Sequence, residues 1–175
     1  MARRRRVIFH IDVNSAFLSW TAVQLLQSGH QDIRLVPSVV SGDPSDRRSI
    51  ITAASIPAKR IGIKTAEPVT MAMRKCPDLV VVKGDWEWYR RCSERFIEIC
   101  RNYSPVLQQF SIDECFIDMS MRNWGEDPVD VATRLKEEVK ATLGFTVNVG
   151  IGSNKLLAKM ASEFEKPDKV HTLWE

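Results

Sequence analysis

The sequence predicts an α+β fold in which a mostly antiparallel sheet is backed by helices. Short runs of β-branched and aromatic residues alternate with longer segments of helical periodicity, which gives the chain an α/β-like order. Proline and glycine separate these segments. The 175 residues, of which 44% are apolar, suffice for one ordinary domain with a small insertion. We therefore expect one main sheet and one inserted lobe.

The N-terminal half begins with an apolar strand at 7–12, which ends in Asp12. A helix should follow, with Asn14 as its cap and Gly29 as its stop. The turn-rich stretch 42–48 separates two further strands, and prolines bracket two short helices. These four elements are expected at 37–41, 49–54, 57–61 and 68–75.

The C-terminal half begins with a strand at 79–83 and a long helix at 85–102, in which apolar positions recur at helical spacing. The positions expected to be buried are Trp88, Tyr89, Cys92, Phe96 and Ile99. The remaining elements are a hairpin at 105–120, a helix at 128–143, a strand at 146–151, a helix at 154–164 and a short strand at 170–173. Residues after 78 and the first strand should form the main sheet, with 15–77 as the inserted lobe.

Charge and cysteine content narrow the class of protein. The formal net charge of +3 permits a nucleic-acid partner without requiring one, because a basic footprint must be clustered to count. The one dense basic run, Arg3–Arg6, is typical of a solvated terminus. The four cysteines show no Cys-x-x-Cys pair and no zinc spacing, which favours reduced thiols. No apolar run is long enough to cross a membrane, so we expect a cytoplasmic protein.

Three carboxylates in strand-like sequence are the strongest chemical signal. Asp12 ends the first strand, and Asp113 and Glu114 lie within the hairpin. Burying such groups is costly unless a cation or a hydrogen-bond partner meets them. Neighbours in a regular strand point to opposite faces, so a tight turn or bulge at 111–114 is needed to aim both hairpin acids at one site. An all-oxygen ligand set suits two Mg²⁺ ions, about 4 Å apart, for phosphoryl transfer.

Simpler explanations exist for single residues. Asp12 alone could cap the following helix, and Asp-Glu alone could be a polar hairpin tip; the set of three favours the metal site. Asp118, on the outgoing strand, is interpreted as an ion-pair partner or a strand-end residue and is not counted as a ligand. Lys155 and Lys159 lie four apart on the last helix, which is typical of a solvated face.

Three separated sequence motifs follow one another along the chain. They are His-Ile-Asp-Val-Asn-Ser-Ala-Phe at 10–17, Phe-Ser-Ile-Asp-Glu-Cys-Phe-Ile-Asp at 110–118, and the run at 149–167 that ends in Glu-Lys-Pro. Together they resemble the Y-family translesion DNA polymerases of the DNA polymerase IV type. The run at 149–167 is the most specific match, and the resemblance covers essentially the whole chain.

The resemblance implies a metal-dependent nucleotidyl transfer. Asp12, Asp113 and Glu114 match the metal-binding carboxylates, and the backbone carbonyl of Val13 would also lie near the metal. The implied cofactor is a pair of Mg²⁺ ions, with Mn²⁺ able to substitute. The implied substrates are primer–template DNA and deoxynucleoside triphosphates, and the implied activity is error-prone synthesis past damaged bases.

Three further positions match residues that meet the nucleotide. Phe17 matches the steric gate beneath the sugar, Lys166 matches the lysine on the triphosphate, and Lys59 stands where the family usually has an arginine. The helix around Phe17 is apolar almost all round, so an ordinary core phenylalanine would show the same pattern.

The chain departs from the family pattern in the same regions. Asn14 stands where a second acid is frequent, and Ala16 where a bulky residue is frequent. The family's Tyr-x-Ala-Arg appears as Ile56-Pro57-Ala58-Lys59, which removes a hydroxyl and replaces a bidentate guanidinium with a point charge. The changes at Ile56 and Lys59 should weaken nucleotide binding without touching the metal ligands.

The resemblance also divides the chain. Residues 1–14 and 78–167 would be the palm, 15–77 the fingers, and 168–175 the start of a thumb. We expect a fragment of a longer polymerase that grips DNA poorly by itself, because phosphate contacts supply most of the affinity in such complexes. A sliding clamp would be a partner of the missing part. Rapid primer extension by the 175-residue chain would contradict this expectation.

Two alternatives remain. A nucleotidyl cyclase also uses a palm-like sheet with paired carboxylates, but the sequence has no Gly-Gly-Asp/Glu-Glu/Phe-type hairpin. A non-catalytic module that docks DNA or protein would not need all three carboxylates. The polymerase interpretation ranks first, the binding module second and the cyclase third.

Overall fold

The structure is a computed structural model that describes residues 6–43, 46, 48–121 and 125–175. Of the arginine run at 3–6, only Arg6 lies within this range. The chain divides into two compact units, which we call the large unit (Met1–Asn14 with Arg91–Glu175) and the small unit (Ser15–Arg90). Helix α4 (Trp86–Tyr103) begins in the small unit and ends in the large one.

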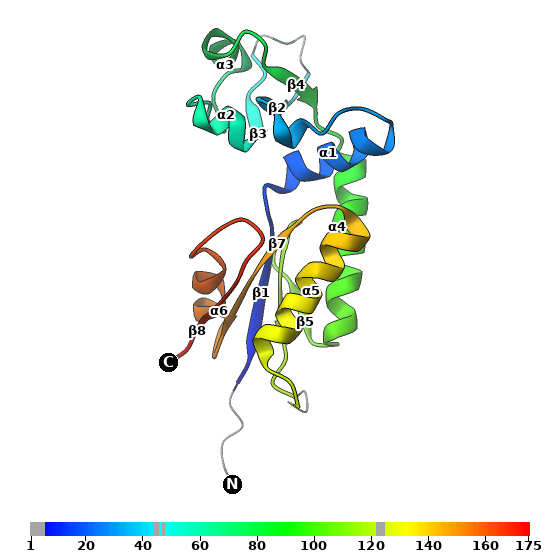
Figure 1. The fold of residues 1–175 in the computed structure, drawn as a ribbon, viewed down its shortest axis with the longest axis vertical. Coiled ribbons are helices and arrows are strands. Elements are labelled where there is room, and N and C mark those ends of the chain that lie inside the picture. The colour runs from blue at the N-terminus through cyan, green and yellow to red at the C-terminus, as the bar shows by residue number, and fades with distance from the viewer. Residues whose placement is uncertain (1–5, 44–45, 47, 122–124) are drawn as a thin grey trace. The chain divides into compact units, whose positions relative to one another are not determined.

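The large unit is built on a five-stranded sheet with the order β5-β6-β1-β7-β8 (Figure 1). Its strands are β1 (Ile8–Val13), β5 (Leu107–Gln109), β6 (Glu114–Asp118), β7 (Val147–Gly152) and β8 (Val170–Leu173). All neighbours pair antiparallel except β7 and β8, which are parallel. The expected α+β class with a mostly antiparallel main sheet is therefore confirmed.

One face of this sheet supplies the core. The register aligns Ile11 of β1 with Cys115 of β6 and Val149 of β7, and all three are fully buried. Helix α5 (Pro128–Leu143) buries a stripe of apolar residues that is inaccessible to solvent. That helix begins at the Asp127 cap, whose side chain accepts from Val129 N–H, and ends at Gly144 in the left-handed region.

The opposite face carries helix α6 (Lys155–Ser162), on the other side of the sheet from α5 (Figure 1). Two glycines of β7 allow this helix to lie against the sheet. A Cβ atom on Gly150 would stand 2.0 Å from the backbone oxygen of Ala158, and one on Gly152 would stand 2.7 Å from the Ala158 nitrogen. Gly150 pairs with His10 of β1, so α6 covers the face to which His10 and Asp12 belong.

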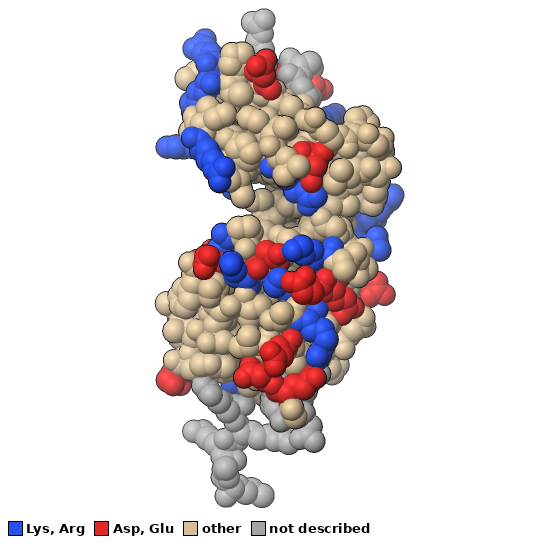
Figure 2. Space-filling model, viewed as in Figure 1, with Lys and Arg blue, Asp and Glu red and all other residues tan. Residues whose placement is uncertain are grey.

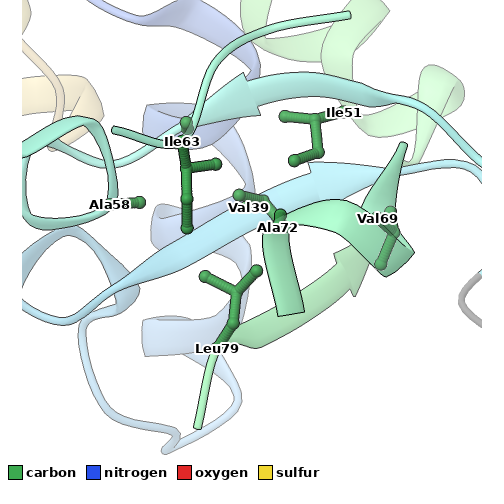
Figure 3. Packing of buried hydrophobic residues seen from close by; sticks show 8 residues of the cluster. Val39, Ile51, Ala58, Ile63, Val69, Ala72 and Leu79 are labelled. Atoms are coloured by element: carbon green, nitrogen blue, oxygen red, sulfur yellow. The ribbon is translucent and has the colours of Figure 1, made fainter. Parts of the chain in front are cut away.

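The small unit has a three-stranded sheet with the order β3-β2-β4. Its elements are α1 (Ala16–Gln27), η1 (Ile33–Leu35), β2 (Ser38–Ser41), β3 (Ile51–Ala54), α2 (Ile56–Arg60), α3 (Val69–Lys75) and β4 (Val80–Lys83). Figure 3 shows its core, in which Val39, Ile51, Ile63 and Leu79 point towards one another between the sheet and the short helices. Each of these four side chains is buried.

Two expectations differ from the structure. Strand β4 pairs with β2 in the small unit rather than joining the main sheet. The segment 168–175, where we expect a thumb to start, contains β8, which pairs with β7 at the edge of the main sheet. Asn14 does not cap α1, whose N-cap is Ser15 with no side-chain hydrogen bond. The Asn14 side chain is committed to hydrogen bonds within the large unit instead.

Within the described part of the chain, we found no helix with both the length and the apolar character needed to traverse a bilayer.

Candidate active site

The strand register brings the three predicted carboxylate positions together. Asp12 and Glu114 are directly opposed in the antiparallel pair of β1 and β6, so their side chains leave the same face of the sheet. Asp113 precedes β6, and its carbonyl accepts from Val13 N–H at 2.9 Å. The chain turns tightly here, because the N–H groups of Phe110 and Ser111 both donate to the Glu114 carbonyl.

The turn gives Asp113 a different direction from a regular strand residue. Residues 111–113 form bends rather than strand. Ser111 Oγ donates to Asp113 Oδ1 at 2.6 Å, which fixes the orientation of that carboxylate. The turn expected at 111–114 is therefore present, and it is what allows adjacent acids to approach the end of β1.

Two lysines that follow β7 in sequence meet the carboxylates. Lys166 Nζ donates to Asp12 Oδ2 at 2.5 Å and to Glu163 Oε1 at 2.8 Å. Lys159 Nζ, on α6, donates to Glu114 Oε2 at 2.5 Å. Lys166 was identified by resemblance. Lys159 was not, because its four-residue spacing from Lys155 is also that of a solvated face.

His10 is a second residue that sequence analysis missed. Its side chain is fully buried beneath α6. Nδ1 lies 2.8 Å from Ser162 Oγ and Nε2 lies 2.8 Å from Glu114 Oε2. The only sequence signal for this role was a polar residue two positions before Asp12, on the same face of an otherwise apolar strand.

Burial and the lysines act on the carboxylates in opposite directions. Burial raises the pKa of Asp12, and the hydrogen bond from Lys166 offsets this only in part, while nearby Asp113 adds to the rise. Burial also acts to raise the pKa of Glu114, but hydrogen bonds from Lys159 and His10 outweigh it, so that pKa is lowered. An additional cation would therefore offset the remaining cost of ionising the Asp12 carboxylate.

The donor chemistry fits a hard dication, although the side chains do not converge on one point. Among the described residues, no group of three or more His, Cys, Asp and Glu side chains is close enough to hold a metal ion. Asp12 and Glu114 each turn to their own lysine instead. The all-oxygen set of two aspartates, one glutamate and the Val13 carbonyl is nevertheless the type that Mg²⁺ selects.

Phe17 and Lys59 belong to the small unit. Phe17 is half-buried among aromatic rings, with centroid distances of 5.0 Å to Tyr89, 5.3 Å to Trp86 and 6.0 Å to Trp20. Phe17, Trp86 and Tyr89 line a hollow of about 170 Å³. The surroundings of Phe17 fit a steric gate for the nucleotide sugar, and they equally fit a phenylalanine at the edge of the core.

Lys59 lies at the exposed C-terminal end of α2. Arg60 follows it, and α3 also ends in two basic residues, Arg74 and Lys75, all of them exposed. Figure 2 shows Lys and Arg side chains gathered along the edge of the small unit at α2 and α3. Lys75 is paired with Glu67 at 2.8 Å, so Lys59, Arg60 and Arg74 form a basic rim, which suits phosphate groups.

Comparison with known proteins adds independent findings. The model of the impB/mucB/samB family matches residues 11–163. DNA polymerase IV of Clostridium acetobutylicum is 49% identical over 171 residues, which are 97% of this chain and 43% of that protein. DNA polymerase IV 1 of Bacillus subtilis is 34% identical over 167 residues, which are 95% of this chain and 39% of that protein.

Solved structures agree on the fold. DinB from Sulfolobus solfataricus superposes with a TM-score of 0.85 at 24% identity, over 96% of this chain and 48% of that one. An insertion ternary complex of Dbh DNA polymerase superposes with a TM-score of 0.83 at 23% identity, over 95% of this chain and 48% of that one. The chain thus spans less than half the length of the relatives it matches.

Proposed function

This chain belongs to the impB/mucB/samB family, and from that membership we propose that it is the catalytic part of a Y-family DNA polymerase that copies past damaged template bases. The proposed reaction is attack of a primer 3′-hydroxyl on the α-phosphorus of a deoxynucleoside triphosphate, with pyrophosphate as the leaving group. Primer–template DNA is the second substrate, and base pairing selects the nucleotide. We infer a cytoplasmic location and a clamp partner from this function alone.

The large unit would be the palm and the small unit the fingers. This assignment places the proposed metal ligands on one sheet, where strand pairing fixes their spacing. It places Phe17, Lys59 and the basic rim on the other unit, which would supply contacts to the sugar and the triphosphate. With this assignment the proposed fingers would correspond to Ser15–Arg90.

Asp12, Asp113, Glu114 and the carbonyl of Val13 would hold the metal ions. Two Mg²⁺ ions, or Mn²⁺ in their place, would lower the pKa of the attacking hydroxyl and neutralise charge on the leaving group when bound. The hydrogen bond from Ser111 fixes the orientation of the Asp113 carboxylate, while the carboxylates of Asp12 and Glu114 are paired with lysines. Burial of Asp12 then favours a cation at this position over solvent.

Lys166 would change partners when substrate binds. Its ammonium now compensates Asp12, and a dication at the carboxylates would take over that role. Lys166 would then be available to the triphosphate, where positive charge stabilises the transition state. Lys159 would remain on Glu114, while Phe17 would underlie the sugar and Lys59 would contact the phosphates.

The observation that carries this proposal is the β1–β6 register, which sets Asp12 opposite Glu114 at the turn that carries Asp113. A cyclase could use similar carboxylates, but the family membership supports the polymerase. A pure binding module would not require an acid such as Asp12, which burial makes costly to ionise.

The test measures the affinity for Mn²⁺ by electron paramagnetic resonance, in the presence of a deoxynucleoside triphosphate. Asp12→Asn and Asp113→Asn should each weaken binding by about tenfold or more, since each removes one charged ligand. Asp118→Asn is the matched control, because Asp118 ends the same hairpin strand opposite Ile8 and accepts from Ser120 N–H. Equal affinity in all four proteins would refute the proposed site.

A further inference from the structure

The segment that carries Lys166 is anchored by two buried asparagines from other strands. Asn14 follows β1 and is 8% exposed, and Asn148 lies in β7 and is fully buried. Asn14 Nδ2 donates to Asn148 Oδ1 at 3.1 Å. We call these two residues the amide pair. The amide pair lies on the Asp12 side of the sheet, because Asn148 is the register partner of Asp12.

Asn148 uses every hydrogen-bonding position of its side chain. Nδ2 donates to the carbonyls of Ser162 at 3.0 Å and Glu165 at 2.6 Å. Oδ1 accepts from Asn14 and from Lys169 N–H at 3.2 Å. An amide has two donors and two acceptor positions, so the inventory is complete. The backbone partners also fix which atom is oxygen and which is nitrogen, since carbonyls only accept and N–H groups only donate.

Asn14 completes the anchor from the other side. Its Oδ1 accepts from Asp168 N–H at 3.0 Å and from Thr146 Oγ1 at 2.9 Å. Together the two asparagines bind backbone groups of residues 162, 165, 168 and 169, on both sides of Lys166. The amide pair therefore fixes the course of the backbone through Lys166.

We propose that Asn14 and Asn148 are positioning residues that hold the Lys166 backbone where its ammonium reaches both Asp12 and an incoming triphosphate; this inference rests on the proposed function. Lys166 Nζ lies at the end of a long, one-third exposed side chain, 2.5 Å from Asp12. Such a side chain has many rotamers, so a fixed backbone is what confines its charge to the site. The pair also accounts for the departure at position 14, because an aspartate could accept from Asp168 but could not donate to Asn148.

The test compares two substitutions at Asn14. Asn14→Ala removes the acceptor of Asp168 N–H, whereas Asn14→Asp keeps it. Asn14→Asp loses the donor to Asn148, however, and sets a carboxylate oxygen against Asn148 Oδ1. We therefore expect amide hydrogen exchange at Asp168 to be fastest in Asn14→Ala and intermediate in Asn14→Asp. Calorimetric titration with inorganic triphosphate and Mg²⁺ should show affinity reduced roughly three- to tenfold in Asn14→Ala and only partly restored in Asn14→Asp.

Lys166→Ala supplies the reference for the lost charge, with an expected loss of about tenfold in triphosphate affinity. If Asn14 acts through Lys166, the double variant Asn14→Ala/Lys166→Ala should bind triphosphate no more weakly than Lys166→Ala alone. The effects of substituting two residues of one network are not additive. Ser104→Ala is the stability control: it removes a partly buried hydrogen bond to the Asp118 carbonyl, elsewhere in the same unit, and should leave triphosphate affinity unchanged.

The outcomes separate the two levels of the argument. If Lys166→Ala weakens triphosphate binding and Asn14→Ala does not, the positioning role is wrong while the proposed function stands. Additive losses in the double variant also overturn the positioning role. If Lys166→Ala itself has no effect, the proposed triphosphate role of Lys166 fails and the inference fails with it.

Discussion

Gly150 should be the least replaceable glycine of the large unit. A Cβ atom there would lie 2.0 Å from Ala158 O and 2.4 Å from Ser162 N. Ordinary contact begins near 3.4 Å, so α6 would have to retreat by about 1.4 Å. The opposing atoms belong to the helix backbone, so a side-chain rotation cannot relieve the contact. Gly150→Ala should therefore destabilise the fold by about 3 kcal/mol, the upper end for overpacking.

The site should suffer with the fold, because α6 carries Lys159 and contributes Ser162 to the His10 contact. Chemical unfolding measures the stability change, and Mn²⁺ titration measures the effect on the carboxylates. Gly125→Ala is the control, since its Cβ would meet nothing within 4 Å. A Gly150→Ala protein within about 0.5 kcal/mol of wild type, with unchanged Mn²⁺ affinity, would refute this reasoning.

Three further predictions concern ionisable groups. Replacing His10 by Leu removes a hydrogen bond that lowers the pKa of Glu114, so that pKa should rise, as an NMR titration of the carboxyl can measure. Burial acts to raise the pKa of Asp168, but its hydrogen bonds from two lysines of α5 outweigh this and lower it. Asp168→Asn should therefore cost about 1 kcal/mol of unfolding free energy at pH 7, allowing for solvent screening, and this difference should vanish as the pH falls below about 4. Burial raises the pKa of the Cys92 thiol to about 12, so at pH 8 only about one molecule in ten thousand carries the thiolate. Iodoacetamide should modify half-exposed Cys76 before Cys92, as peptide mass spectrometry can establish.

Each of these has a contrary result. An unchanged or lower Glu114 pKa without His10 would mean that the imidazole does not stabilise the carboxylate. The pKa of Asp168 is lower in the folded protein than in the unfolded chain. The stabilisation from its carboxylate is therefore fully present above the unfolded-state pKa, and it is lost as the pH falls through the folded-state pKa. A difference that grew on acidification would contradict it. Equal labelling of both cysteines in the folded protein would contradict the burial of Cys92.

Local chemistry made much of the fold predictable. Helix α5 occupies the predicted residues because Asp127, Pro128 and Gly144 mark its ends within the chain itself. The partner of β4 was not predictable in the same way. Its four residues are mostly valine, and such a run fits either sheet, since the choice depends on which strand lies beside it in space.

In the candidate site too, some residues could be predicted from local sequence and others could not. Asp12, Asp113 and Glu114 could be selected because carboxylates stand out in apolar strands. Lys159 and His10 could not, because their meeting with Glu114 joins positions 45 and 104 residues apart and follows from register and from the seating of α6. Asn14 was interpreted as a local helix cap, yet its partners lie more than 130 residues away. No local pattern encodes that contact.

The amide pair has a consequence for how the protein responds to its medium. Asparagine side chains carry no charge and do not titrate, so their hydrogen bonds are insensitive to acidity and to dissolved electrolyte. The attraction between Lys166 and Asp12, by contrast, weakens as ions accumulate around it, since Lys166 is one-third exposed. Concentrated salt should therefore release the ammonium while the backbone beneath it keeps its place, so that dilution restores the contact without refolding.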